Sequence, residues 1–135
     1  MLLGDLLTLR QLALPVKLVV FNNSVLGFVE LKMKAVGLLD YGTDLVNPHF
    51  AQLAESAETF GVCVEKPEEL RPALTRALAH GGRALVKALV NRQELSRPPT
   101  ITLDQALGFS LYMMRAVLSG RGDELIDLVK TNLFR

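Results

Sequence analysis

The sequence has few of the residues on which several classes of protein depend. Its 135 residues include a single cysteine and no tryptophan, and its formal net charge is only +1. One cysteine cannot form a disulfide framework within the chain, which suits a reducing cytoplasm. That residue, Cys63, lies in the apolar run FGVCVE, and we expect it to be a small buried hydrophobic residue rather than a reactive thiol. The near-neutral charge, without an Arg/Lys stripe interleaved with aromatics, argues against nucleic-acid binding.

Long apolar runs are also lacking. No run approaches the roughly 20 residues that a membrane-spanning helix needs. The start, MLLGDLLTLRQLALP, has neither the basic region nor the small-residue cleavage site of a signal peptide. We therefore expect a cytoplasmic protein. Half of the residues are nevertheless hydrophobic, which is enough for the core of one domain.

The first half of the chain alternates between helical and strand character. Leu2–Leu14 has a broad apolar face and is expected to be a helix that stops at Pro15. Val16–Phe21 is rich in β-branched residues without alternation, which predicts a strand covered on both faces, as in a parallel sheet. A second helix is expected over Val25–Val36, with Gly37 as its C-cap.

The middle of the chain predicts a βαβ unit. After the loop YGTDLVNP, the stretch HFAQLAESAETFG returns to helical spacing. A short strand, VCVE, then leads to a helix that opens at Pro67 with acids in its first turn, and Gly81-Gly82 lead to another strand. Strand, helix and strand in this order favour a parallel sheet. The predicted fold class is therefore α/β with a helical tail.

The sequence changes character after Asn91. The polar connector RQELSRPPTITLDQ precedes a helical stretch, LDQALGFSLYMMRAVLSG, and SGRG separates this from an amphipathic segment, Asp123–Phe134. Its apolar positions are Leu125, Leu128, Val129 and Leu133. The segment is either a helix packed on its own domain or a membrane-binding helix. The polar face is not rich in Lys and Arg, so spacing and charge alone favour packing.

Polar residues follow the first predicted strand directly: Asn22, Asn23 and Ser24. In open parallel sheets, ligands bind beyond the carboxyl ends of the strands. An asparagine oxygen suits Mg²⁺ there, the next helix would offer N–H groups to phosphate, and Gly27 would allow close backbone approach. The alternative is an Asx turn that closes the strand exit, and spacing alone favours this turn.

The stretch VKLVVFNNSVLGFVELKMKAVG resembles the second half of the thiamine diphosphate motif, which runs from Gly-Asp-Gly to Asn-Asn. It is most similar to the branch of pyruvate oxidases and quinone-dependent pyruvate dehydrogenases, and the similarity continues through RPPTITLDQALGFSLYMMRAVLSGRGDELIDLVKTN. The resemblance implies the C-terminal part of the thiamine diphosphate-binding fold, an incomplete doubly wound parallel sheet. The expected division is 1–92 for this domain, 93–120 for the connector and helix, and 121–135 for the tail.

The same resemblance assigns roles to single residues. It implies that Mg²⁺ is held by the side chain of Asn23 and the carbonyl of Val25, and that Phe28 lies on the electron path between thiamine and flavin. The residues implied to line the cofactor are Asn23, Ser24, Val25, Leu26, Gly27, Phe28 and Val29. The Gly-Asp-Gly half is expected upstream of Met1, and Asp5 lies too close to Asn23 to replace it.

The implied reaction is oxidative decarboxylation of pyruvate to acetate and CO₂, with thiamine diphosphate, Mg²⁺ and FAD as cofactors and quinone as acceptor. The parent enzyme is expected to be a homo-oligomer, peripheral to the inner face of the cell membrane, with its tail on the lipid. The chain alone is expected to be inactive. One alternative is a non-catalytic truncated or split module that docks onto a partner subunit, and another is a free-standing lipid-binding protein.

The remaining polar candidates are weaker. His49 and His80 are far apart and lack a paired acid or cysteine at metal-ligand spacing, so we expect both near helix ends. Ser24 has no visible base partner, which leaves nucleophilic catalysis unsupported. The soft apolar patch near the C-terminus is expected to be core packing rather than a quinone site; it comprises Phe109, Tyr112, Met113 and Met114.

Overall fold

The computed structural model of the protein describes residues 4–94 and 102–133, the side chain of Leu133 excepted. The described residues form two compact units. The first contains the residues up to Asn22 and Val46–Val90, and the second contains Asn23–Leu45 and the residues from Asn91 onward. The predicted division into three consecutive segments stays a prediction.

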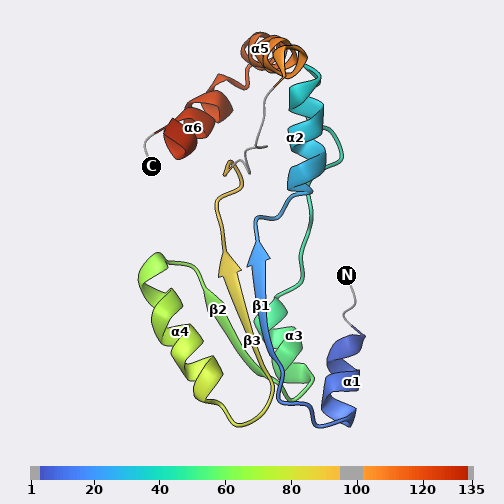
Figure 1. The fold of residues 1–135 in the computed structure, drawn as a ribbon, viewed down its shortest axis with the longest axis vertical. Coiled ribbons are helices and arrows are strands. Elements are labelled where there is room, and N and C mark those ends of the chain that lie inside the picture. Colours follow the sequence, from blue (N-terminus) through green and yellow to red (C-terminus); the bar gives the residue numbers. More distant parts are fainter. Residues whose placement is uncertain (1–3, 95–101, 134–135) are drawn as a thin grey trace. The chain divides into compact units, whose positions relative to one another are not determined.

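The first unit is an α/β layer structure, as predicted. Its elements are α1 (Asp5–Gln11), β1 (Lys17–Asn22), α3 (Phe50–Ser56), β2 (Phe60–Val64), α4 (Pro67–Ala79) and β3 (Ala84–Leu89). The three strands lie in the order β1-β3-β2, and both pairs are parallel (Figure 1). The predicted βαβ unit is therefore confirmed as β2-α4-β3.

Helices α3 and α4 cover opposite faces of this sheet (Figure 1). Leu85 of β3 packs with Phe50 and Ala54 of α3. Its neighbour Val86 packs with Ala73 of α4 in a second cluster. Because successive side chains of a strand point to opposite faces, the central strand β3 is buried on both sides.

Strand β1 departs from the prediction that it is covered on both faces. Leu18 and Val20 pack against the first core cluster, but Val19 and Phe21 are 43% and 71% exposed. The reason is topological: β1 is an edge strand, and α4 packs on β2 and β3. An unbroken apolar run predicts a buried strand, yet the position in the sheet decides how much of it is buried.

Two other local predictions are wrong in extent. The first helix does not reach Pro15, since α1 ends at Gln11 and Ala13 adopts the left-handed conformation (φ 50°) that turns the chain. Leu2 and Leu3 lie outside the described residues. Cys63 is a free thiol that is only half-buried, because β2 is the other edge strand of the sheet.

The second unit is helical and contains α2 (Gly27–Ala35), α5 (Leu103–Leu118) and α6 (Gly122–Leu133). Helix α2 begins two residues later than predicted, and its C-cap is Val36 rather than the predicted Gly37. Gly37 follows directly with a φ of 79°, a left-handed conformation that suits glycine just after a helix end. Tyr112 of α5 is fully buried, but Met114 is 59% exposed. The prediction of core packing is therefore wrong for Met114, which lies on the outer face of α5.

Helix α6 contains the apolar positions of the predicted tail. Leu128 is buried, Leu125 is half-buried and Val129 is 41% exposed, while the side chain of Leu133 lies outside the described residues. In this arrangement Leu128 is not available to a lipid surface. Binding of the tail to a membrane stays a prediction. No helix in the described ranges is both long and apolar enough to cross a membrane.

Polar contacts hold α6 to the rest of the second unit. Asn132 donates through Nδ2 to the carbonyl of Gln93 at 2.8 Å, and Asn91 donates to the hydroxyl of Thr131 at 3.1 Å. Arg121, directly before α6, pairs with Asp40 at 2.8 Å. These contacts join both ends of α6 to two other segments, residues 38–45 and 91–94.

Candidate functional site

The two asparagines at the exit of β1 differ in their surroundings. Asn22 is the last residue of β1 and is buried. Its side-chain oxygen accepts a hydrogen bond from Asn47 Nδ2 at 2.8 Å, and its carbonyl accepts the N–H of Val90 at 3.1 Å. Asn22 therefore closes the carboxyl end of the sheet within the first unit, which is a structural role.

Asn23 begins the second unit and forms a tight turn. Its Oδ1 accepts the N–H of Val25 at 3.2 Å, which is the Asx turn that spacing predicts. Between them, Ser24 has a φ of 56°, in a left-handed region that few residues other than glycine adopt. An amide oxygen has two lone pairs, so this hydrogen bond leaves the oxygen able to coordinate a cation as well. The turn and the metal assignment are thus compatible.

The backbone after Asn23 is held by residues 43–45. Val25 forms an antiparallel bridge with Asp44. The N–H of Leu26 donates to the carbonyl of Thr43 at 2.8 Å, and the N–H of Leu45 donates to the carbonyl of Ser24 at 2.9 Å. These two hydrogen bonds fix the path of the Asn23–Leu26 turn before α2 begins.

The first turn of α2 offers N–H groups next to Asn23. Its N-cap residue, Leu26, makes no side-chain capping bond, so these donors are not satisfied in that way. A Cβ at Gly27 would lie 3.2 Å from Asn23 Nδ2, so glycine allows the asparagine amide to pack closely against the helix start. A neutral amide oxygen beside helix N–H groups fits Mg²⁺ paired with a diphosphate.

A pocket of about 200 Å³ opens beside this turn. It is lined by Asn23, Gly27, Phe28, Glu30, Leu31, Lys34, Arg92 and Glu94. Pockets that enclose a whole small molecule measure roughly 300–1,000 Å³, so this one suits one end of a ligand. Of the seven residues predicted to line a cofactor, the fold brings three to the pocket: Asn23, Gly27 and Phe28.

The other four predicted residues do not line the pocket. Val25 is buried, and Ser24 lies exposed in the turn. Leu26 and Val29 are 43% and 48% exposed on other sides of the helix start. The sequence does not indicate the five additional lining residues Glu30, Leu31, Lys34, Arg92 and Glu94, two of which lie more than sixty positions from Gly27. The Glu30–Lys34 spacing could have revealed an i,i+4 ion pair, but not its burial.

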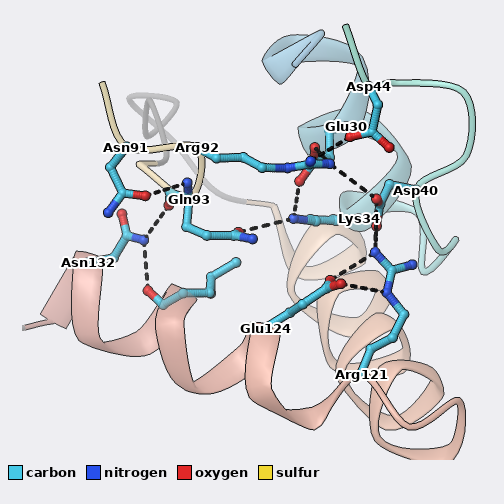
Figure 2. A network of polar contacts seen from close by, with 11 residues as sticks. Glu30, Lys34, Asp40, Asp44, Asn91, Arg92, Gln93, Arg121, Glu124 and Asn132 are labelled. Carbon is cyan, nitrogen blue, oxygen red and sulfur yellow. Dashed lines mark hydrogen bonds and ion pairs between the residues drawn. The ribbon is translucent and has the colours of Figure 1, made fainter. Parts of the chain in front are cut away.

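Charged side chains that line the pocket form a network with neighbouring polar residues (Figure 2). Glu30 and Lys34 of α2 are both buried, 5% and 1% exposed, and form an ion pair. Lys34 Nζ also lies 5.3 Å from the ring centroid of Tyr112, and Arg92 Nη2 lies 3.3 Å from Glu30 Oε2. Burial also raises the pKa of the Tyr112 phenol, although the charge of Lys34 opposes this rise. The buried charges are therefore paired, as burial requires.

The far side of the network is centred on Asp40. Arg121 lies 2.8 Å from both Asp40 Oδ1 and Glu124 Oε2. Burial by itself would raise the pKa of Asp40, but the hydrogen bond and charge of Arg121 outweigh it, so the pKa is lowered. Hydrogen bonds to Glu124 and Asp40 raise the pKa of Arg121.

The lowered pKa of Asp40 predicts acid-sensitive stability. A carboxyl whose pKa is lower in the folded state stabilises the fold above its unfolded pKa of about 3.9, and this contribution disappears as the pH falls through the folded pKa. We expect Asp40→Asn to reduce the free energy of unfolding at neutral pH, and its difference from the unsubstituted chain to shrink below about pH 5. Urea unfolding across pH measures this difference. Glu58→Gln, in the exposed Arg10–Glu58 pair, should show little effect at any pH.

The remaining polar candidates have structural positions. His49 is the N-cap of α3, where its Nδ1 accepts the N–H of Gln52 at 3.3 Å, and His80 is the C-cap of α4 and stacks on Phe60. Asp5 lies in the first turn of α1. In the described part of the chain, no three His, Cys, Asp or Glu residues gather as a metal site. A metal bound beside the Asn23 turn would therefore need amide and carbonyl oxygens as ligands.

Comparison with known proteins identifies the family of the chain. Residues 1–88 match the family described as "Thiamine pyrophosphate enzyme, C-terminal TPP binding domain". The thiamine pyrophosphate-containing protein YdaP of Bacillus subtilis is 37% identical over 131 residues, which are 97% of this chain and 23% of that protein. Mitochondrial acetolactate synthase of Schizosaccharomyces pombe is 32% identical over 91 residues, which are 67% of this chain and 14% of the synthase. The chain thus spans less than a quarter of either relative.

Proposed function

The chain belongs to the thiamine pyrophosphate enzyme family, as a C-terminal TPP binding domain, and we propose that its Asn23 turn holds the metal-diphosphate end of that cofactor. The observation that carries this proposal is the placement of Asn23 and Gly27 together on one pocket, beside the first turn of α2. When bound, thiamine diphosphate supplies the carbanion chemistry of the reaction. The residues of this chain supply binding and orientation.

Each residue has a separate task in this proposal. Asn23 Oδ1 and the Val25 carbonyl coordinate Mg²⁺, which neutralises the diphosphate. The N–H groups at the start of α2 bind the phosphate oxygens. Gly27 keeps the backbone close to them, and Phe28, which is 73% exposed, presents an aromatic ring at the rim of the pocket.

Within the family we propose the branch that oxidises pyruvate to acetate and CO₂ with FAD and passes electrons to quinone. The support is the extended sequence resemblance described above, in which Phe28 takes the position between thiamine and flavin. The homo-oligomeric state, the peripheral location at the inner face of the membrane and the lipid contact of the tail are parts of the same proposal.

A second candidate is a non-catalytic module that docks onto a partner subunit. The exposed side chains of Val19 and Phe21 on the edge strand β1 favour it, because an uncovered apolar edge strand invites pairing. The chain alone is expected to be inactive in either case, so its oligomeric state tests the docking module. Self-association supports the module, whereas a monodisperse, folded monomer at high concentration contradicts it. Incubation with pyruvate, thiamine diphosphate, Mg²⁺, FAD and an artificial electron acceptor tests the branch: acetate supports the oxidative branch and overturns the expected inactivity, and acetolactate contradicts that branch.

Substitution of Asn23 tests the cofactor site directly. We expect Asn23→Ala to weaken binding of thiamine diphosphate in the presence of Mg²⁺ by more than about 100-fold, since even residues that only support a metal ligand contribute 10–100-fold. Asn23→Asp keeps an oxygen ligand and the Asx turn, and should retain most of the affinity. Isothermal titration of each variant at fixed Mg²⁺ gives the affinities, and equal binding by Asn23→Ala would show that Asn23 holds no metal.

A further inference from the structure

We propose that Arg92 is a positioning residue that sets the geometry of the Asn23–Leu26 turn, an inference that rests on the proposed cofactor function. Arg92 lies 69 positions after Asn23 in the sequence, outside the stretch that identifies the family motif. The fold nevertheless places both residues on the same pocket. Figure 2 shows its guanidinium pointing toward acids of two different segments.

The first contact of Arg92 is to the helix that follows the turn. Its Nη2 lies 3.3 Å from Glu30 Oε2. Glu30 is three residues after Gly27, hence on the same side of the first turn of α2, and its side chain is only 7% exposed. A charge-assisted contact at this depth fixes the start of α2, because a displaced helix would leave the buried carboxylate with one partner fewer.

The second contact is to the segment that holds the turn from the other side. Arg92 Nη1 lies 2.5 Å from Asp44 Oδ1, and Nη2 lies 3.7 Å from Asp40 Oδ2. Asp44 is the residue that forms the antiparallel bridge with Val25. One guanidinium therefore joins the helix after the turn to the strand-like segment beside the turn. The planar fork of arginine donates in two directions at once, which the point charge of lysine does not reproduce.

The backbone that carries Arg92 is itself anchored. Gln93 donates its N–H to Asn91 Oδ1 at 2.9 Å, its carbonyl accepts from Asn132 at 2.8 Å, and its Oε1 lies 3.5 Å from Lys34 Nζ. Because this segment is fixed, Arg92 restrains the elements it contacts rather than following them. Three carboxylates surround its charge, so the guanidinium is committed to these acids and not to a phosphate of the ligand.

The test compares Arg92→Met with Arg121→Met in the full chain. Arg121 also pairs with buried acid in the second unit, but it contacts neither Glu30 nor Asp44 in the described network, so it controls for lost stability alone. Isothermal titration with thiamine diphosphate at fixed Mg²⁺ should show about 10–100-fold weaker binding for Arg92→Met, an intermediate loss for Arg92→Lys, and less than about twofold for Arg121→Met. Thermal unfolding of each variant gives the accompanying loss of stability.

A second measurement needs no cofactor. The amides of Leu26 and Leu45 donate the two hydrogen bonds that hold the turn, so their hydrogen exchange reports its opening directly. Exchange at both should be at least about tenfold faster in Arg92→Met than in Arg121→Met.

Each outcome decides one question. Unchanged exchange and affinity in Arg92→Met overturn the positioning role, and equal losses in Arg121→Met overturn it as well. Faster exchange only in Arg92→Met, in a chain that binds no thiamine diphosphate even unsubstituted, supports the positioning of the turn but contradicts the proposed function.

Discussion

Replacing Gly108 by alanine is expected to lower the free energy of unfolding of the second unit by about 3 kcal/mol, the upper end for an overpacked site. A Cβ at this position would lie 2.1 Å from the carbonyl oxygen of Ala35 and 3.1 Å from Val36 Cα. Both atoms belong to the backbone at the end of α2, so they cannot move aside as a flexible side chain can. Helices α2 and α5 would have to separate, and the packing around Gly37 and Tyr112 would be lost with them.

Gly122→Ala is the matched control for this substitution. Gly122 is also helical, at the start of α6, but a Cβ there would meet no atom within 4 Å. The control should retain the stability of the unsubstituted chain or gain up to about 1 kcal/mol from the better helix propensity of alanine. Urea unfolding followed by circular dichroism measures both variants. Equal stability of Gly108→Ala and Gly122→Ala would contradict the close contact between α2 and α5.

Lys34→Met should lower the free energy of unfolding by an amount similar to, or larger than, that of Gly108→Ala. The substitution leaves the carboxylate of Glu30 buried with only the more distant Arg92 as an ion-pair partner among the described residues, and breaking a buried pair from one side costs about 3–5 kcal/mol. The aromatic contact of Lys34 with Tyr112 is lost as well. We expect the urea midpoint to fall accordingly, with little change in the denaturant slope.

A double variant separates the cost of leaving one buried charge unpaired from the cost of changing the side-chain volume. Glu30→Leu combined with Lys34→Met removes both charges at similar volume and should recover much of the loss, since apolar residues often replace a buried pair without cost. Arg10→Met provides the contrast, because the Arg10–Glu58 pair is 47% and 64% exposed and should contribute less than about 1 kcal/mol. If Lys34→Met were as mild as Arg10→Met, the Glu30–Lys34 pair would not be buried in solution.

Several features could be predicted because they depend on neighbours in the sequence. The β2-α4-β3 unit was recognisable from two short apolar runs around a helix with Pro67 and acids at its start. The positions of His49 and His80 at helix ends follow from local backbone signals of the same kind. The Asx turn of Asn23 also involves residues only two positions apart.

Other features depend on residues that are distant in the sequence, and they could not be predicted. The exposure of Phe21 follows from the edge position of β1, which strand order decides. The buried side of α6 at Leu128 and the need for glycine at 108 both arise where helices meet.

The sequence by itself determined the α/β class, the parallel βαβ unit and, through the stretch around Asn23, the thiamine pyrophosphate enzyme family. Those conclusions rest on local periodicity and on a contiguous motif. Only the tertiary structure decided that Glu30 and Lys34 are buried and that Arg92 joins Glu30 to Asp44 beside the Asn23 turn. The physical reason is that an i,i+4 pair has the same spacing at a surface and in a core, and that a charge interacts with whatever the fold brings within a few ångströms.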